Sequence, residues 1–86
     1  MGASQIVHWV VAFRQIGRDA FAELPERMPS AAAAVARAKA LTLTHVGVIA
    51  WSRSVVPETG DYGDPVVLVR LGTIPDWFDA TGDAGV

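Results

Sequence analysis

The chain has 86 residues, no cysteine and a formal net charge of −2, so one small domain without disulfides or thiolate metal sites is expected. The weakly acidic balance disfavours recognition of nucleic acid or of an anionic membrane through bulk positive charge. Hydrophobic residues make up 51% of the chain, which is high for so small a soluble monomer and favours self-association.

The first predicted element is a strand over residues 6–14, "IVHWVVAFR", which is rich in β-branched and aromatic residues. Alternation along a strand places its side chains on two faces. One face carries Val7, Trp9, Val11 and Phe13, and the other carries Ile6, His8, Val10, Ala12 and Arg14.

Residues 18–29, "RDAFAELPERMP", contain two prolines four positions apart, which excludes a long regular helix. The segment is compatible with a helical turn or with a short edge strand around residues 21–27. An edge strand tolerates Pro25 because one of its edges forms no ladder, and we favour that interpretation.

A helix is predicted over residues 30–44, with Ser30 as its N-cap after Pro29. A narrow stripe of mostly small residues recurs at helical spacing and would let the helix lie close to a sheet. The stripe consists of Ala31, Ala34, Val35, Ala38, Leu41 and Thr42.

Two further strands are predicted over residues 46–53 and 65–71, joined by a loop of about eleven residues. The order strand, weak strand, helix, strand, strand predicts an α+β fold, a two-layer sandwich of one helix on an antiparallel sheet of three or four strands. We expect residues 1–76 to form the single domain and residues 77–86 to be a partly disordered tail.

Pairing of Ser54 with Pro65 would place Ala50 opposite Val69. The helix-covered face would then carry Val46, Val48, Ala50, Ser52, Val67, Val69 and Leu71, joined by Trp9 and Phe13. The second face would carry Ile49, Trp51, Arg53, Val66, Leu68 and Arg70, with His8, Val10 and Arg14.

That second face is too apolar for ordinary solvent contact, and tryptophan and arginine are typical of interfaces. Candidate interface residues are Ile49, Trp51, Arg53, Leu68, Arg70 and Arg14. Either a second subunit covers this face, or residues 18–29 or the "IPDWF" segment fold back over it, with Trp77 and Phe78 as the cover.

The loop "PETGDYGDP" carries Glu58, Asp61 and Asp64. The ligand pattern of a calcium loop is absent, whereas glycines beside aspartates are typical of turns. We therefore expect a solvated hairpin loop that binds no metal. His8 and His45 are expected to be structural, because neither lies in a recognisable catalytic or zinc-binding pattern. No cofactor is expected.

The runs "VGVIAWSR", "PETGDYGDPVVLVRLG" and "IPD" resemble short proteins of GC-rich bacteria, alphaproteobacteria in particular, for which no activity is assigned. The resemblance is close over about residues 46–76. It implies that one recurring unit comprises Trp51, Ser52, Arg53, Glu58, Thr59, Gly60 and Asp61. An ion pair of Arg53 with Glu58 or Asp61 would hold the loop.

Three functional hypotheses follow from the sequence. The first is a small non-enzymatic interaction module that forms a homodimer and binds another, unidentified protein. The second is a binder of single-stranded nucleic acid or nucleotides that uses Trp51, Arg53, Arg70 and Arg14. The third is a ligand-binding domain or enzyme without a recognisable motif. With no charge-free apolar span of about 20 residues and no basic N-terminal segment, we expect a cytoplasmic protein that does not bind membranes.

Overall fold

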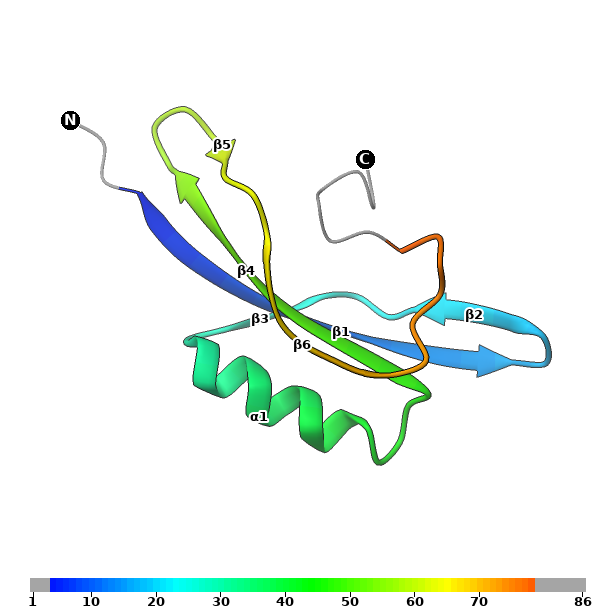
Figure 1. Ribbon diagram of the computed structural model, residues 1–86. Coiled ribbons are helices and arrows are strands. Elements are labelled where there is room, and N and C mark those ends of the chain that lie inside the picture. The colour runs from blue at the N-terminus through cyan, green and yellow to red at the C-terminus, as the bar shows by residue number, and fades with distance from the viewer. Residues whose placement is uncertain (1–3, 79–86) are drawn as a thin grey trace.

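The structure, a computed structural model, describes residues 4–78 as one helix packed against a curled antiparallel sheet (Figure 1). This arrangement confirms the predicted α+β class. The elements in chain order are β1 (Gln5–Ile16), β2 (Asp19–Ala22), β3 (Glu26–Met28), α1 (Ala31–Leu41), β4 (Gly47–Val56), β5 (Asp61–Tyr62) and β6 (Val66–Gly72).

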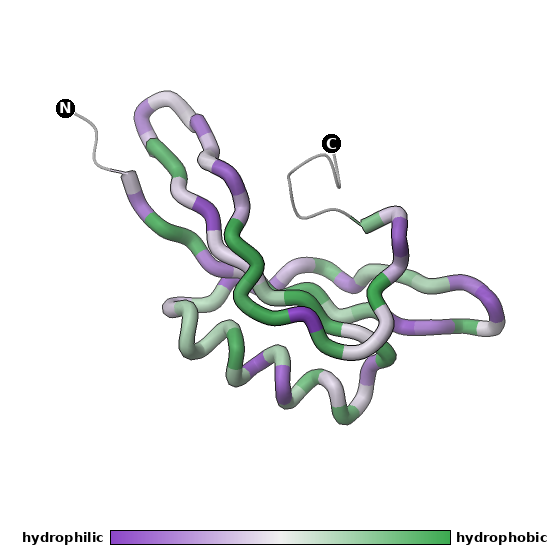
Figure 2. Tube along the Cα trace, viewed as in Figure 1, coloured by the Kyte–Doolittle hydropathy of each residue, from purple (hydrophilic) through white to green (hydrophobic). Residues whose placement is uncertain are grey.

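Strand β1 lies in the middle of the sheet. One edge of β1 pairs with β2 and β3. The other edge pairs with β4, which in turn pairs with β5 and β6. The predicted edge strand near residues 21–27 is therefore present, divided around Pro25 into two short strands. Figure 2 shows the hydrophobic residues gathered in the middle of the long strands, whereas the hairpin tips are hydrophilic.

Helix α1 begins where the sequence predicts, because the Ser30 hydroxyl accepts a hydrogen bond from the Ala33 amide at 3.0 Å. The helix ends at Leu41, three residues earlier than expected. The hydroxyls of Thr42 and Thr44 donate to the carbonyls of Lys39 and Leu41, and these bonds close the last turn. No helix among residues 4–78 is long and apolar enough to cross a membrane.

The two faces of the sheet hold separate apolar clusters. The cluster under the helix consists of Val10, Ala12, Ala34, Ala38, Leu41, Val48 and Ala50. The cluster on the opposite face consists of Val11, Phe13, Ile49 and Trp51. The small residues of α1 thus pack on small residues of the sheet, as the stripe predicts.

The side chains of β1 were predicted on the wrong faces of the sheet relative to those of β4. Trp9 lies opposite Trp51 in the ladder, and residues directly opposite one another share a face. Trp9 and Phe13 therefore lie on the face away from the helix, and Val10 packs beneath the helix. By the same alternation, His8 and Arg14 point to the helix side of the sheet.

Leu68 and Val67 were also assigned to the wrong faces of the sheet, since Val67 lies opposite Trp51 on the face away from the helix. The predicted pairing of Ala50 with Val69 is confirmed, but the register shifts between Ala50 and Trp51. This bulge makes Leu68 an additional residue in β6, and its side chain packs against the helix-side cluster.

The chain leaves β6 through a close backbone crossing. Gly72 has a φ of 70°, and a Cβ on Gly72 would overlap the Val46 carbonyl oxygen. The Thr73 amide then donates to that carbonyl at 2.8 Å. Residues 73–78, here called the C-terminal strap, continue across the sheet, where Ile74 and Phe78 pack on the second cluster. Ile74 and Phe78 of the "IPDWF" segment therefore cover part of this face, as one alternative predicted, whereas Trp77 is 60% exposed. Residues 79–86 of the expected tail lie outside the described residues.

Candidate functional site

Six of the seven aromatic residues gather on the sheet face away from the helix and make a continuous row of ring contacts. We call this row the aromatic band. Its members, from one end to the other, are Tyr62, Trp9, Trp51, Phe78, Phe13 and Trp77.

The strands position the rings of the band in their order. Trp9 on β1 and Trp51 on β4 are cross-strand partners, and their rings stack at a centroid distance of 6.0 Å. Phe78 from the strap presents an edge to Phe13 at 5.0 Å and to Trp51 at 5.9 Å. These are the offset and edge-to-face geometries that aromatic pairs prefer.

The inner part of the band is already covered by the chain itself. Ile49 is 0% exposed and Trp51 is 8% exposed, although the sequence assigned both to an intermolecular interface. The outer part stays accessible, with Trp77 60% exposed and Tyr62 55% exposed. Val67, which lies opposite Trp51 in β6, is 43% exposed on the same face.

Charged residues flank the band. Arg53 lies over the Tyr62 ring at 4.9 Å from its centroid, and its Nε donates to the Gly63 carbonyl at 3.0 Å. Arg70 lies opposite Ile49 on the same face and is exposed. The exposed carboxylates nearby in the sequence are Asp61, Asp64 and Asp76.

The structure brings together four of the six predicted interface residues, namely Ile49, Trp51, Arg53 and Arg70. Leu68 and Arg14 lie on the other face, for the reasons given above. Trp9 and Phe13 were not predicted as members of this site. The sequence shows that Trp9, Val11 and Phe13 share one face of β1. Only the pairing of β1 with β4 shows that this face lies away from the helix.

The acidic loop is a hairpin turn, as predicted. The amides of Thr59 and Gly60 donate to the Val56 carbonyl, and Gly60 has a φ of 74°. The loop is tied to Arg53 through the Gly63 carbonyl and the Tyr62 ring, instead of through the predicted ion pair with Glu58 or Asp61. Within residues 4–78, no three His, Cys, Asp or Glu side chains are grouped so that they could hold a metal ion.

A polar cluster lies at the opposite end of the molecule from the hairpin loop, beyond the C-terminus of α1. His45 has a side chain that is only 7% exposed, and its Nε2 lies 2.8 Å from Glu23 Oε1. Its Nδ1 lies 3.2 Å from the Leu41 carbonyl oxygen and 2.8 Å from Thr44 Oγ1. The His45 ring thus contacts the Glu23 carboxylate, the Thr44 hydroxyl and the Leu41 carbonyl at the end of the helix.

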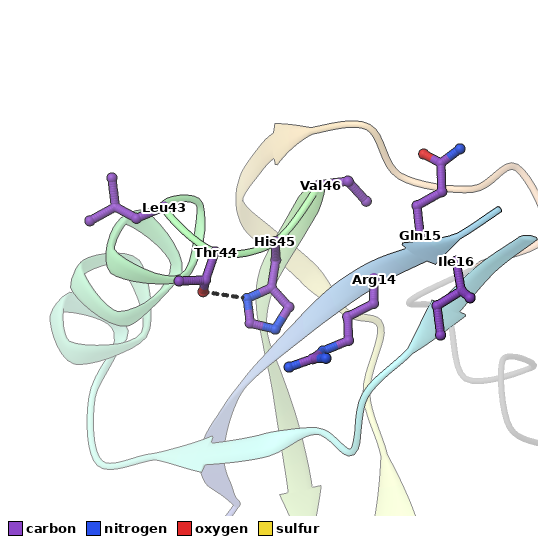
Figure 3. A pocket seen from close by; sticks show the side chains of 7 residues that line it. All are labelled: Arg14, Gln15, Ile16, Leu43, Thr44, His45 and Val46. Carbon is purple, nitrogen blue, oxygen red and sulfur yellow. Dashed lines mark hydrogen bonds between the residues drawn. The ribbon is translucent and has the colours of Figure 1, made fainter. Parts of the chain in front are cut away.

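Arg14 completes this cluster, because its Nε donates to Glu23 Oε2. Burial raises the pKa of the Glu23 carboxyl, but the hydrogen bonds from Arg14 and His45, together with their charges, bring the pKa below its ordinary value. Thr44, His45 and Glu23 form a hydroxyl–imidazole–carboxylate chain. The Leu41 carbonyl oxygen also lies within hydrogen-bond distance of Nδ1, so the ring contacts the helix end as well as Thr44 (Figure 3).

His8, the other histidine, lies on the helix side of the sheet with Nδ1 at hydrogen-bond distance from the buried Ser52 hydroxyl. It contacts no carboxylate among the described residues. The two histidines therefore lie in separate structural environments.

No family model, curated protein or solved structure was found to match this chain, so the site is defined by its own geometry.

Proposed function

We propose that the protein is a non-enzymatic interaction module that works as a homodimer through the outer part of the aromatic band. The observation that supports this proposal is the exposure of Tyr62, Val67 and Trp77 on one face of the sheet. Exposed aromatic residues are typical of interfaces, and Tyr62 and Trp77 lie at the two ends of the band.

The exposed apolar area can contribute to association. With a tryptophan or tyrosine side chain offering about 200 Å², the exposed parts of Trp77, Tyr62 and Val67 together amount to about 300 Å² per subunit. At ~25 cal/mol per Å², burying that area contributes about 7 kcal/mol per subunit. The sum over two subunits reaches the range of estimated association costs, which run from ~4 to ~15 kcal/mol.

The charges around the band favour a second copy of this chain as the partner. A two-fold axis brings the same surface of both subunits together. Arg53 and Arg70 of one subunit can then face Asp61, Asp64 or Asp76 of the other, so the surface is complementary to itself.

Binding of single-stranded nucleic acid has weaker support. Trp51 stacks against Trp9 and is covered by Phe78, so it offers no face to a base. Arg14, which was assigned to the same surface, lies on the other side of the sheet. No side chain of the aromatic band supports a ligand-binding or enzymatic role.

Sedimentation equilibrium at ~50 μM tests the proposal, because a micromolar dimer is largely formed at that concentration. We expect a dimer for the native chain and a monomer for Trp77→Glu. Leu43→Glu is the matched control, since Leu43 is 86% exposed and follows α1 on the other side of the sheet; this variant should remain dimeric.

A native monomer, or a Trp77→Glu variant that remains dimeric, would refute the proposed interface. Binding of an oligothymidylate probe that weakens steeply with salt would favour the nucleic-acid alternative instead.

A further inference from the structure

We infer that the C-terminal strap is a hinged cover of the aromatic band, and that its closure is coupled to formation of the dimer. The coupling rests on the proposed homodimer, because Trp77 lies on the strap and is also the most exposed of the three side chains of the proposed surface, at 60%. A surface carried by a movable segment is complete only while that segment is closed, so whatever stabilises the closed strap also favours the dimer.

Side chains, and not backbone hydrogen bonds, attach the strap to the sheet. The Thr73 amide donates to the Val46 carbonyl at 2.8 Å, and within residues 4–78 this is the last backbone hydrogen bond between the strap and the sheet. Beyond it, Ile74 and Phe78 supply the packing on the second cluster. Segments with few buried contacts and few backbone hydrogen bonds open at a lower free energy than the core. The strap therefore opens while the sheet stays folded.

The close backbone crossing fixes the point about which the strap moves. Gly72 has a φ of 70°, and there is no room for a Cβ beside the Val46 carbonyl. A Cβ on Gly47 would likewise overlap the Thr73 carbonyl oxygen. The chain is thus held against β4 as far as Thr73, and the movable part comprises residues 74–78.

One turn of the strap separates an inward side chain from an outward one. The Phe78 amide donates to the Pro75 carbonyl at 3.1 Å and closes this turn. Phe78 is half-buried and presents its edge to the rings of Phe13 and Trp51. Trp77 contacts only the Phe13 ring of the sheet, at 6.1 Å, and remains largely exposed. Phe78 is therefore the positioning residue that holds Trp77 on the proposed dimer surface.

Strap closure and dimerisation are linked as two equilibria of one molecule. A partner subunit that contacts Trp77 binds the closed form more tightly, and it shifts the strap toward closure by that difference in affinity. Because each subunit supplies one strap, the dissociation constant of the dimer varies as the inverse square of the closed fraction. A strap that is closed for about one third of the time raises that constant about tenfold.

Cysteine labelling measures opening of the strap, because the chain contains no cysteine of its own. Val11→Cys places a thiol in the cluster on which the strap packs, and Val48→Cys places one in the cluster under the helix. The two positions are matched in burial, at 1% and 0% exposed. A water-soluble aromatic disulfide reacts only with an exposed thiolate. At ~1 μM protein, where a micromolar dimer is substantially dissociated, we expect Val11→Cys to react about tenfold faster, since local opening requires less free energy than global unfolding.

At ~50 μM, dimer formation should slow the labelling of Val11→Cys. Adding Tyr62→Glu, at the exposed far end of the band, should remove this dependence on concentration and leave the fast labelling, because the strap itself is unchanged. Adding Phe78→Ala should speed the labelling and raise the dissociation constant measured by sedimentation about tenfold. Phe78→Leu, which retains most of the apolar contact, should have a smaller effect on both.

Equal labelling rates of the two thiols at the lower concentration would show that the strap opens only when the whole domain unfolds, and would overturn the inference. The coupling fails if the native chain sediments as a dimer but Val11→Cys reacts equally fast at both concentrations. A native chain that sediments as a monomer at the higher concentration is instead the failure of the proposed function. In that case the ratio of the two labelling rates still decides whether the strap is a hinged cover.

Discussion

Replacing Phe78 by Ala removes the ring that holds the C-terminal strap on the sheet. Phe78 contacts the rings of Phe13 and Trp51 edge-on, and among residues 4–78 its backbone bonds only to Pro75, within the strap itself. The strap beyond Thr73 is therefore held to the sheet mainly by side-chain packing. Loss of this ring should uncover the aromatic band from Phe13 to Trp51.

The size of the effect follows from the burial of the ring. A phenylalanine buries at most about 200 Å², and Phe78 is partly buried, so about 130 Å² of apolar surface is returned to water. At ~25 cal/mol per Å² this amounts to about 3 kcal/mol, as an upper value because the unfolded chain is itself partly collapsed. The two edge contacts add about 1 kcal/mol, and the released strap regains backbone entropy. We expect a net loss of about 2–3 kcal/mol.

Urea unfolding followed by circular dichroism, with all variants at one protein concentration, measures this loss. A loss of 2–3 kcal/mol corresponds to a melting temperature lower by about 10–20 °C for a domain of this size. Phe78→Leu retains most of the apolar burial and should lose about 1 kcal/mol. Leu43→Ala, at an 86% exposed position, should change stability by less than ~0.5 kcal/mol. If Phe78→Ala is as stable as Leu43→Ala, the strap does not cover the sheet.

Two more predictions concern the backbone crossing and the polar cluster. Gly47→Ala should destabilise the fold by about 3 kcal/mol in the same unfolding assay, because its Cβ would overlap the Thr73 carbonyl oxygen. Gly17→Ala has open space around it but a φ of 63°, and should cost only about 1 kcal/mol; equal losses would contradict the close crossing. The lowered pKa of Glu23 means that its contribution to stability is fully present above the unfolded-state pKa and is lost as the pH falls through the folded-state pKa. Thermal unfolding between pH 3 and pH 7 should therefore depend less on pH for Glu23→Gln than for the native chain, and identical pH profiles would show that the cluster contributes nothing.

Local features of the fold could be predicted from the sequence because their causes are local. The Ser30 cap, the glycines of the hairpin loop and the two-residue alternation of residues 6–14 each depend on neighbours within a few positions. The pairing of Ala50 with Val69 could also be predicted, because a hairpin connects the two strands and limits their register.

The errors arose where distant segments meet. Trp9 pairs with Trp51 across more than 40 positions, and no local pattern determines that register. The bulge that turns Leu68 toward the helix lies within the run "VVLVR", which contains no glycine to mark it. That the strap covers the sheet was predicted only as an alternative. The segment "IPDWF" has no periodicity that would place it, although its apolar residues indicated that it could cover a face. The candidate site was therefore placed on the correct face of β4 but with the wrong neighbours from β1.

The central position of β1 has a consequence for synthesis of the protein. β1 ends at Ile16 and its long partner β4 begins at Gly47, so a ribosome working at ~5–20 residues per second needs roughly 2–6 seconds to produce the intervening chain. During that interval β1 can contact only β2, β3 and α1, and Val11 and Phe13, which are almost fully buried in the finished fold on the face away from the helix, lack the cover of β4 and the strap. The nascent chain thus exposes an apolar strand with an open edge, the state in which polypeptides associate wrongly. Its yield in a host cell should depend on chaperone supply and on how quickly codons 17–47 are translated.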